Sequence, residues 1–149
     1  MTPLVTVEIR THIAAPPDAV WARLTDHEGM PGWLKGLHGV TLEPPGKPER
    51  NGIGAIRVLR APGLRLREQV VAWSPPRHYE YKVLDGAPLR DHLGRVEVQP
   101  AAQGTDVLWR IRFHPAVRGT GWLLRLLLQR LIGSGLARLR TQLEAASPA

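Results

Sequence analysis

Titratable side chains alternate with apolar ones in three runs of the sequence, and their types could move protons or orient a bound molecule. His92, Tyr81 and Glu68 each share the alternate-residue parity of nearby valine, leucine or tyrosine side chains. In a half-buried strand, this parity places all three on the inward face. An inward histidine could act as a general acid or base near neutral pH or donate to a ligand carbonyl. An inward tyrosine could orient a ligand through its hydroxyl.

Each of these residues also has a purely structural interpretation. His92 could be a hydrogen-bonded core histidine, and the hydroxyl of Tyr81 could reach solvent at a strand end. An inward Glu68 needs a partner, for which Arg57 and Arg60 on the preceding strand are candidates. The opposite face of the strand that contains Glu68 could point inward instead, so the orientation of this strand stays open at this point.

Two tryptophans and one polar turn complete the candidates. Trp109 shares a face with three apolar neighbours, so it is either core filler or the wall of a pocket, and its indole N–H needs a partner. Trp33 follows a Gly-Met-Pro-Gly bend, which predicts a position at the rim of a pocket rather than in the core. The acidic "DHEG" turn at 26–29 is interpreted as a solvated surface turn.

Several kinds of chemistry are disfavoured by what the sequence lacks. The chain has no cysteine, and its six histidines are dispersed. It contains no HExxH, P-loop or GxGxxG motif. We therefore expect no metal site and no cofactor.

The elements that must position these residues are marked by alternation and by turn signals. The predicted strands are 4–13, 39–44, 54–60, 64–73, 78–84, 91–99 and 105–114, and the predicted helices are 17–25, a second short turn of helix, and 119–146. Strands spaced by about a dozen residues favour an antiparallel meander over βαβ units. A long apolar helix can bury its face only against such a sheet, so we predict one α+β domain over 1–149.

The closing helix carries a broad apolar stripe on which Leu128 and Ile132 are the candidates for ligand contact. The other members of the stripe are Leu124, Leu131, Gly135, Leu139 and Leu143. The "IGSG" segment at 132–135 places two glycines within the helix. These small residues serve either close packing on the sheet or space for a ligand.

The order of these segments resembles the START-like superfamily of polyketide cyclase/dehydrase and lipid-transport proteins. The resemblance rests on "IAAPPDAVWARLTD", "MPGWLKGL", "GIGAIR", "EQVVAWSPPRHYEY", "GRVEVQPAAQGTDVLWRIRF" and "GTGWLLRLLLQRLI". It implies the helix-grip fold, in which a curved seven-stranded antiparallel sheet wraps around a long C-terminal helix, with two short helices after the first strand. It also implies a cavity between sheet and helix.

The function that this resemblance implies is binding or transport of an apolar or aromatic small molecule, such as a lipid, polyketide or quinone. The cavity would be lined by Trp33, Glu68, Tyr81, His92, Trp109, Leu128 and Ile132. An alternative is a cyclase, aromatase or dehydratase in which the histidine, tyrosine and glutamate of this set shuttle protons. A second alternative is a basic module that docks on RNA, the ribosome or an acidic membrane.

The charge pattern limits the partners. The net charge is +7, and after Val107 the chain has seven arginines but only one acidic residue, Glu144. The arginines are scattered singly, so we expect no DNA partner, and RNA or an acidic membrane is left open without being favoured. No signal peptide or membrane span is recognisable, which predicts a soluble cytoplasmic protein. Monomer and homodimer both remain open.

Overall fold

The computed structural model describes residues 3–146, and its elements follow the order predicted from the sequence. The strands are β1 (Val5–Ile13), β2 (Gly39–Leu42), β3 (Ile56–Ala61), β4 (Leu64–Ser74), β5 (His78–Asp85), β6 (Leu89–Ala101) and β7 (Gly104–Pro115). The helices are α1 (Pro17–Thr25), the short 3₁₀ helix η1 (His27–Gly32) and α2 (Gly121–Ala146). The predicted boundaries are shifted by a few residues at most.

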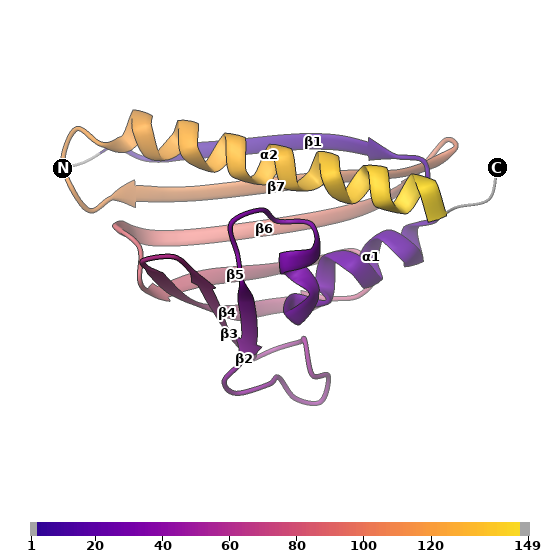
Figure 1. The fold of residues 1–149 in the computed structure, drawn as a ribbon, viewed down its shortest axis with the longest axis horizontal. Helices are drawn as coiled ribbons and strands as arrows, with labels where there is room; N and C mark the ends of the chain where they lie inside the picture. The colour runs from indigo at the N-terminus through magenta and orange to yellow at the C-terminus, as the bar shows by residue number, and fades with distance from the viewer. Residues whose placement is uncertain (1–2, 147–149) are drawn as a thin grey trace.

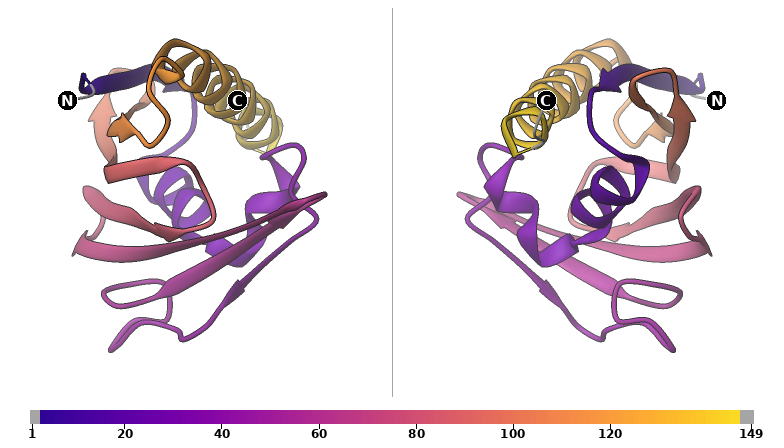
Figure 2. Two further views of the ribbon diagram at one scale, coloured as in Figure 1. Left: turned by 90° about the vertical axis from the view of Figure 1, so that its left-hand side faces the viewer. Right: turned by 90° about the vertical axis from the view of Figure 1, so that its right-hand side faces the viewer.

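The seven strands form one antiparallel sheet in the order β1-β7-β6-β5-β4-β3-β2. Strands β2 to β7 are a meander, because each pairs with the next along the chain. Strand β1 joins the far side by pairing with β7 over its whole length. The sheet is strongly curved, so its concave face surrounds the interior (Figures 1 and 2).

The two short helices lie on the concave side of the sheet (Figure 2). Helix α1 begins with Pro17, as predicted, since the first helical position needs no N–H donor. It buries Val20, Trp21 and Leu24. Helix η1 follows at once and packs against β2. The pair therefore closes one part of the interior.

Helix α2 runs along β1 and covers the remaining part of the concave side (Figure 1). Its C-terminal half is tied down by polar contacts as well as by apolar packing. The Glu144 carboxylate accepts from the Ala14 N–H at 2.9 Å, and the Gln142 side chain donates to the Gly32 carbonyl at 2.9 Å. The buried residues of α2 are Ile132, Gly135, Leu136, Leu139 and Leu143. All of them except Ile132, which lies just before its start, are in this half.

This is the α+β helix-grip arrangement predicted above, with one correction on α2. Leu131 was placed on the buried stripe, but its side chain is 40% exposed. The buried side is set by Ile132 and Leu136, and successive helical residues are rotated by about 100°. Leu131 therefore turns toward solvent. Within residues 3–146, no helix has both the length and the apolar character that a membrane span requires.

The two glycines of the "IGSG" segment have different surroundings. A Cβ on Gly135 would lie 2.7 Å from Leu34 Cδ1 and 3.4 Å from the Trp33 ring. A Cβ on Gly133 would meet nothing within 4 Å. At Gly135, close packing against the chain after η1 is therefore the reason for the missing side chain.

This difference predicts opposite effects of the same substitution in one helix. Gly133→Ala should stabilise the protein by about 0.5–1 kcal/mol, because alanine is the better helix former and has room here. Gly135→Ala should destabilise it by about 1–3 kcal/mol through overpacking against buried side chains. Urea unfolding of both variants measures the two free energies. Equal effects of the two substitutions would contradict the packing described here.

Candidate functional site

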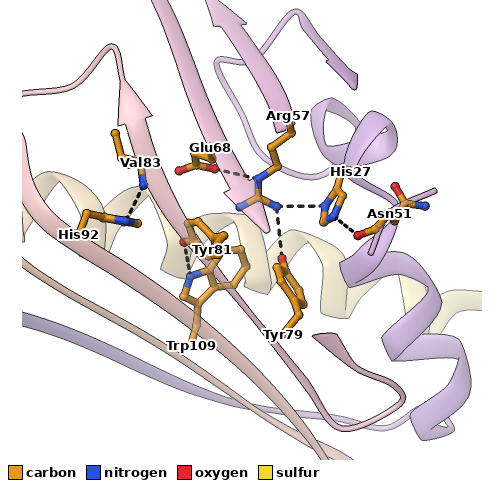
Figure 3. A network of polar contacts seen from close by, with 9 residues as sticks. All are labelled: His27, Asn51, Arg57, Glu68, Tyr79, Tyr81, Val83, His92 and Trp109. Atoms are coloured by element: carbon orange, nitrogen blue, oxygen red, sulfur yellow. Dashed lines mark hydrogen bonds and ion pairs between the residues drawn. The ribbon is translucent and has the colours of Figure 1, made fainter. Parts of the chain in front are cut away.

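A buried arginine and a buried glutamate form the centre of the site on the concave face of the sheet (Figure 3). Arg57 on β3 lies directly across from Glu68 on β4 in the strand register. The Arg57 Nε donates to Glu68 Oε1 at 2.8 Å, and the two residues are only 1% and 6% exposed. The pairing answers the open question about β4: the face with Glu68 and Val70 points inward.

The other side of the Arg57 guanidinium meets a histidine and a tyrosine (Figure 3). Its Nη1 donates to the Tyr79 hydroxyl at 3.3 Å and lies 3.1 Å from Nδ1 of His27. Because arginine has only donors, His27 Nδ1 must accept. The other ring nitrogen, Nε2, then carries the proton and donates to the Asn51 carbonyl at 3.0 Å. His27 therefore links the charge centre to the loop before β3.

Aromatic rings continue the site across the sheet. The Arg57 guanidinium carbon lies 4.3 Å from the centroid of the Tyr81 ring, a cation–π contact. The Tyr81 hydroxyl accepts from the Trp109 indole N–H at 3.0 Å. The Tyr81 ring occupies the space above Gly94, where a Cβ would lie 2.2 Å from the ring. The room left by Gly94 is therefore taken by a protein side chain.

His92 lies at the end of this row and makes a structural hydrogen bond. Its Nδ1 accepts from the Val83 N–H at 3.1 Å, so the proton of the neutral ring is on Nε2 (Figure 3). The ring packs beside Tyr81 with centroids 5.4 Å apart. This corresponds to the structural interpretation of His92.

Burial controls the ionisation of these groups. Burial and the Arg57 charge lower the pKa of His27 to about 3 and that of His92 to about 4, so both rings are neutral at pH 7. Burial also raises the pKa values of Tyr79 and Tyr81. Burial, the largest effect, opposes the charge of Arg57, but Glu68, Tyr79 and Tyr81 together outweigh it, and the pKa of Arg57 is raised. Among residues 3–146, the buried charges are therefore those of one ion pair.

Four of the seven predicted site residues lie together on the sheet. Of the other three, two are on α2 and the third is Trp33. Glu68, Tyr81, His92 and Trp109 share the row just described. On α2, Ile132 is buried at 5% exposure and Leu128 is half-buried. These positions do not by themselves test ligand contact.

The predicted rim position of Trp33 is wrong. Trp33 is only 1% exposed, and its ring lies edge-on to Trp109 with centroids 6.1 Å apart. It is drawn into the core because Gly135 of α2 offers a flat surface against which the ring packs. Its indole N–H is buried without a hydrogen-bond partner among the described residues.

Sequence reasoning missed His27 and gave Arg57 only as a candidate partner. In the "DHEG" turn, Asp26 and Glu28 are exposed as predicted, but the prediction is wrong for His27, which is fully buried. A helix of six residues is too short for periodicity to reveal which side is buried. Tyr79 shares the alternate-residue parity of Tyr81, and its burial agrees with that pattern.

The surroundings of this buried cluster, which comprises His27, Arg57, Glu68, Tyr79, Tyr81, His92 and Trp109, bear on metal and ligand binding. Residues 3–146 contain no group of three or more histidine or carboxylate side chains placed to hold a metal ion. Four hollows of about 320 to 480 Å³ open at the surface, and all four are lined by residues outside the cluster. Around Arg57, tyrosine and tryptophan rings fill the interior instead.

Solved structures share this architecture at low sequence identity. A START superfamily protein from Mycobacterium smegmatis aligns with a TM-score of 0.78 and 14% identity, covering 96% of this chain and 99% of the other. XoxI from Bacillus cereus gives 0.75 and 19%, covering 93% and 95%. Ginseng major latex-like protein 151 from Panax ginseng gives 0.70 and 17%, covering 94% and 97%. These similarities establish the fold.

Sequence comparison assigns the family. The chain matches none of the curated protein sequences. Residues 5–144 match the family model described as polyketide cyclase/dehydrase and lipid transport. This match spans nearly the whole chain and agrees with the fold and with the resemblance in the segments quoted above. The chain therefore belongs to the polyketide cyclase/dehydrase and lipid transport family.

Proposed function

We propose that this protein binds and carries a neutral apolar or aromatic small molecule between the sheet and α2. The ligand would contact Trp33 and Trp109 on one side and the α2 residues Leu128 and Ile132 on the other. Its carbonyl or hydroxyl group would be oriented by the polar row that includes Glu68, Tyr81 and His92. Because side chains fill this interior, binding must displace some of the rings or move α2 away from the sheet.

The observation that carries this proposal is the unpartnered indole N–H of Trp33. A buried donor without an acceptor costs about 1–3 kcal/mol, and such groups are rare in native proteins. This one lies next to Trp109 and against α2. A ligand carbonyl that accepts from this N–H would remove the cost, which favours ligands with an acceptor.

Charge favours a neutral ligand. Arg57, the one buried cation among residues 3–146, is already balanced by Glu68 at 2.8 Å. His27 and His92 are neutral at pH 7 because their pKa values are lowered to about 3 and about 4. A carboxylate ligand would therefore bring an unbalanced charge into a desolvated interior, which is strongly unfavourable.

The same ionisation states favour binding over catalysis. General acids and bases work best when their pKa lies near the operating pH. The lowered pKa values of the two histidines and the raised pKa values of Tyr79 and Tyr81 move these groups away from neutrality. The Glu68 carboxylate is held by Arg57. Neither the two histidines nor the two tyrosines are poised for proton transfer at pH 7.

The first test is chemical. Organic extraction of the purified protein, followed by mass spectrometry, should recover an apolar compound in stoichiometric amount. In parallel, a naphthoquinone should bind the extracted protein and quench its tryptophan fluorescence. The chain has no cysteine, so thiol addition cannot imitate binding. If the extract is empty and the quinone does not bind, the proposal fails.

Trp33→Phe tests the donor directly. The ring packing is largely kept, while the N–H that would hold the carbonyl is lost, so the affinity for the naphthoquinone should fall by about 2- to 10-fold. Trp73→Phe is the matched control, since its indole N–H is also buried without a partner but its ring packs on Trp21 of α1, 5.4 Å away. Isothermal titration calorimetry measures both affinities. Equal losses in the two variants would remove Trp33 from the site.

Glu68→Gln tests the charge argument. The substitution keeps a hydrogen-bond acceptor for Arg57 but leaves its charge unbalanced, so a carboxylate ligand could replace the lost partner. The affinity for a naphthoate relative to the naphthoquinone should rise by about tenfold or more. Glu80→Gln makes the same change in net charge on the outer side of β5, beside Arg95. It should leave the ratio unchanged, and a rise in both variants would contradict the proposed interior site.

The neutral histidines predict a pH dependence of stability. Their pKa values are lowered in the folded state, to about 3 for His27 and about 4 for His92, from about 6.5. Between about pH 4 and 6.5 the unfolded chain therefore binds two more protons, and stability falls as pH falls, by about 2.7 kcal/mol per pH unit. His27→Gln should halve this slope in urea unfolding. The exposed His38→Gln should not alter it, and an unchanged slope in His27→Gln would contradict the assignment.

A further inference from the structure

The N-terminal half of α2 presents an apolar surface to solvent. We call it the outer leucine face, and it consists of Trp122, Leu123, Leu126, Leu127 and Leu131. Trp122 and Leu127 are 71% and 54% exposed. On a helix, residues four apart are neighbours, so the five side chains form two adjacent rows. They point away from the buried side of α2, where a helix of this kind usually carries polar residues.

Neighbouring segments extend the outer leucine face beyond the helix. Val117, in the loop before α2, is 56% exposed, and Leu4, just before β1, is 54% exposed. A hollow of about 400 Å³ beside Trp122 is lined by Leu4, Val5, Pro115 and Arg125, among others. Contiguous apolar surface of this kind, unlike scattered exposed leucines, marks an interaction site.

The charges around this surface are all positive. Arg118, Arg125 and Arg130 are exposed, and Arg130 continues the row of Trp122 and Leu126. Among the described residues, no carboxylate forms an ion pair with any of the three. The sequence has no acidic residue between Asp106 and Glu144. The partner that fits is therefore apolar with a negatively charged border.

We propose that the outer leucine face docks the protein on an anionic lipid surface, with α2 lying in the plane of the interface. The leucines would enter the boundary between headgroups and acyl chains, and Trp122 would sit at headgroup level. The arginines would extend their charged ends toward lipid phosphates. This proposal goes beyond the binding of a small molecule and does not depend on it.

A second copy of the chain fits this surface less well. Face-to-face packing of two outer leucine faces would bring the Arg130 side chains of both copies into one apolar contact. Buried like charges without carboxylate partners are strongly unfavourable. RNA fits less well too, because stacking needs aromatic side chains and Trp122 is the one aromatic residue of the face. Both partners become outcomes of the experiment below.

The experiment measures binding of the full chain to vesicles. Vesicles of equal parts phosphatidylglycerol and phosphatidylcholine should bind the protein in a flotation assay at low salt, and pure phosphatidylcholine vesicles should bind it far more weakly. Binding should decrease as salt increases. Trp122 serves as a reporter because it is 71% exposed, whereas Trp21, Trp33 and Trp109 are at most 9% exposed and Trp73 is half-buried. Its emission should shift to the blue on the anionic vesicles.

Two pairs of double variants test whether vesicle binding depends on the outer leucine face itself or on the exposed apolar residues and net charge of the whole protein. Leu123→Ser with Leu127→Ser should lower vesicle affinity by about tenfold or more, and these side chains are exposed, so folding should be kept. The control is Ile53→Ser with Leu64→Ser, two exposed residues elsewhere, at 47% and 43% exposure. This control should bind like the original protein.

The second pair changes charge by equal amounts. Arg125→Glu with Arg130→Glu should lower vesicle affinity by about 30-fold or more. Arg65→Glu with Arg77→Glu, also exposed, should have a much smaller effect.

Three outcomes would overturn the proposal. Equal losses in the α2 charge variant and its control would show attraction by net charge alone. If light scattering finds a dimer that the serine substitutions on α2 abolish, and the protein does not bind vesicles, the face would be assigned to a second copy of the chain. Binding to an RNA oligonucleotide but not to anionic vesicles would assign it to nucleic acid.

Discussion

The burial of one positive charge is the constraint on which the rest of the interior depends. Arg57 cannot lose its proton, so inside the protein it must be surrounded by acceptors. Glu68 provides the charge, and its position across the β3–β4 ladder fixes the register of those strands. Tyr79 and His27 both accept from Nη1. Breaking such a pair typically costs about 3–5 kcal/mol, since it leaves an uncompensated charge.

The aromatic core is organised around that charge. Tyr81 lies against the guanidinium and therefore needs the space above Gly94, and its hydroxyl then becomes the acceptor for Trp109. The position of Trp109 in turn determines where Trp33 packs, and with it the close approach of α2 at Gly135. Each step is a contact between two named groups. The place where α2 meets the core is thus connected to the ion pair through a continuous series of contacts.

Alternation in the sequence was sufficient to predict the strands and most of the inward residues, because a strand has a period of two whatever it packs against. Tyr81, His92 and Trp109 follow from that rule alone. The pairing of Glu68 with Arg57 was foreseen only as one option, because register depends on contacts distant in sequence. His27 and Trp33 were misplaced, since the irregular segment around η1 has no period from which burial can be read.

The two sides of α2 were not distinguishable in the sequence for a related reason. A stripe was drawn through leucines that are about equally apolar, and nothing in a single sequence tells which leucines meet the sheet. The structure separates them: Leu136, Leu139 and Leu143 are buried, whereas Leu127 and Leu131 face solvent. A helix with two apolar sides can remove both from water only if the sheet covers one and another apolar surface covers the other.

The C-terminal half of α2 is anchored by Gln142, which donates to Gly32 of η1, and by Glu144, which accepts from Ala14. The half that lacks those anchors carries the uncovered leucines. A lipid surface on that half would therefore act on the more weakly held end of the helix that closes the interior, and an apolar ligand could pass between membrane and interior with little exposure to water.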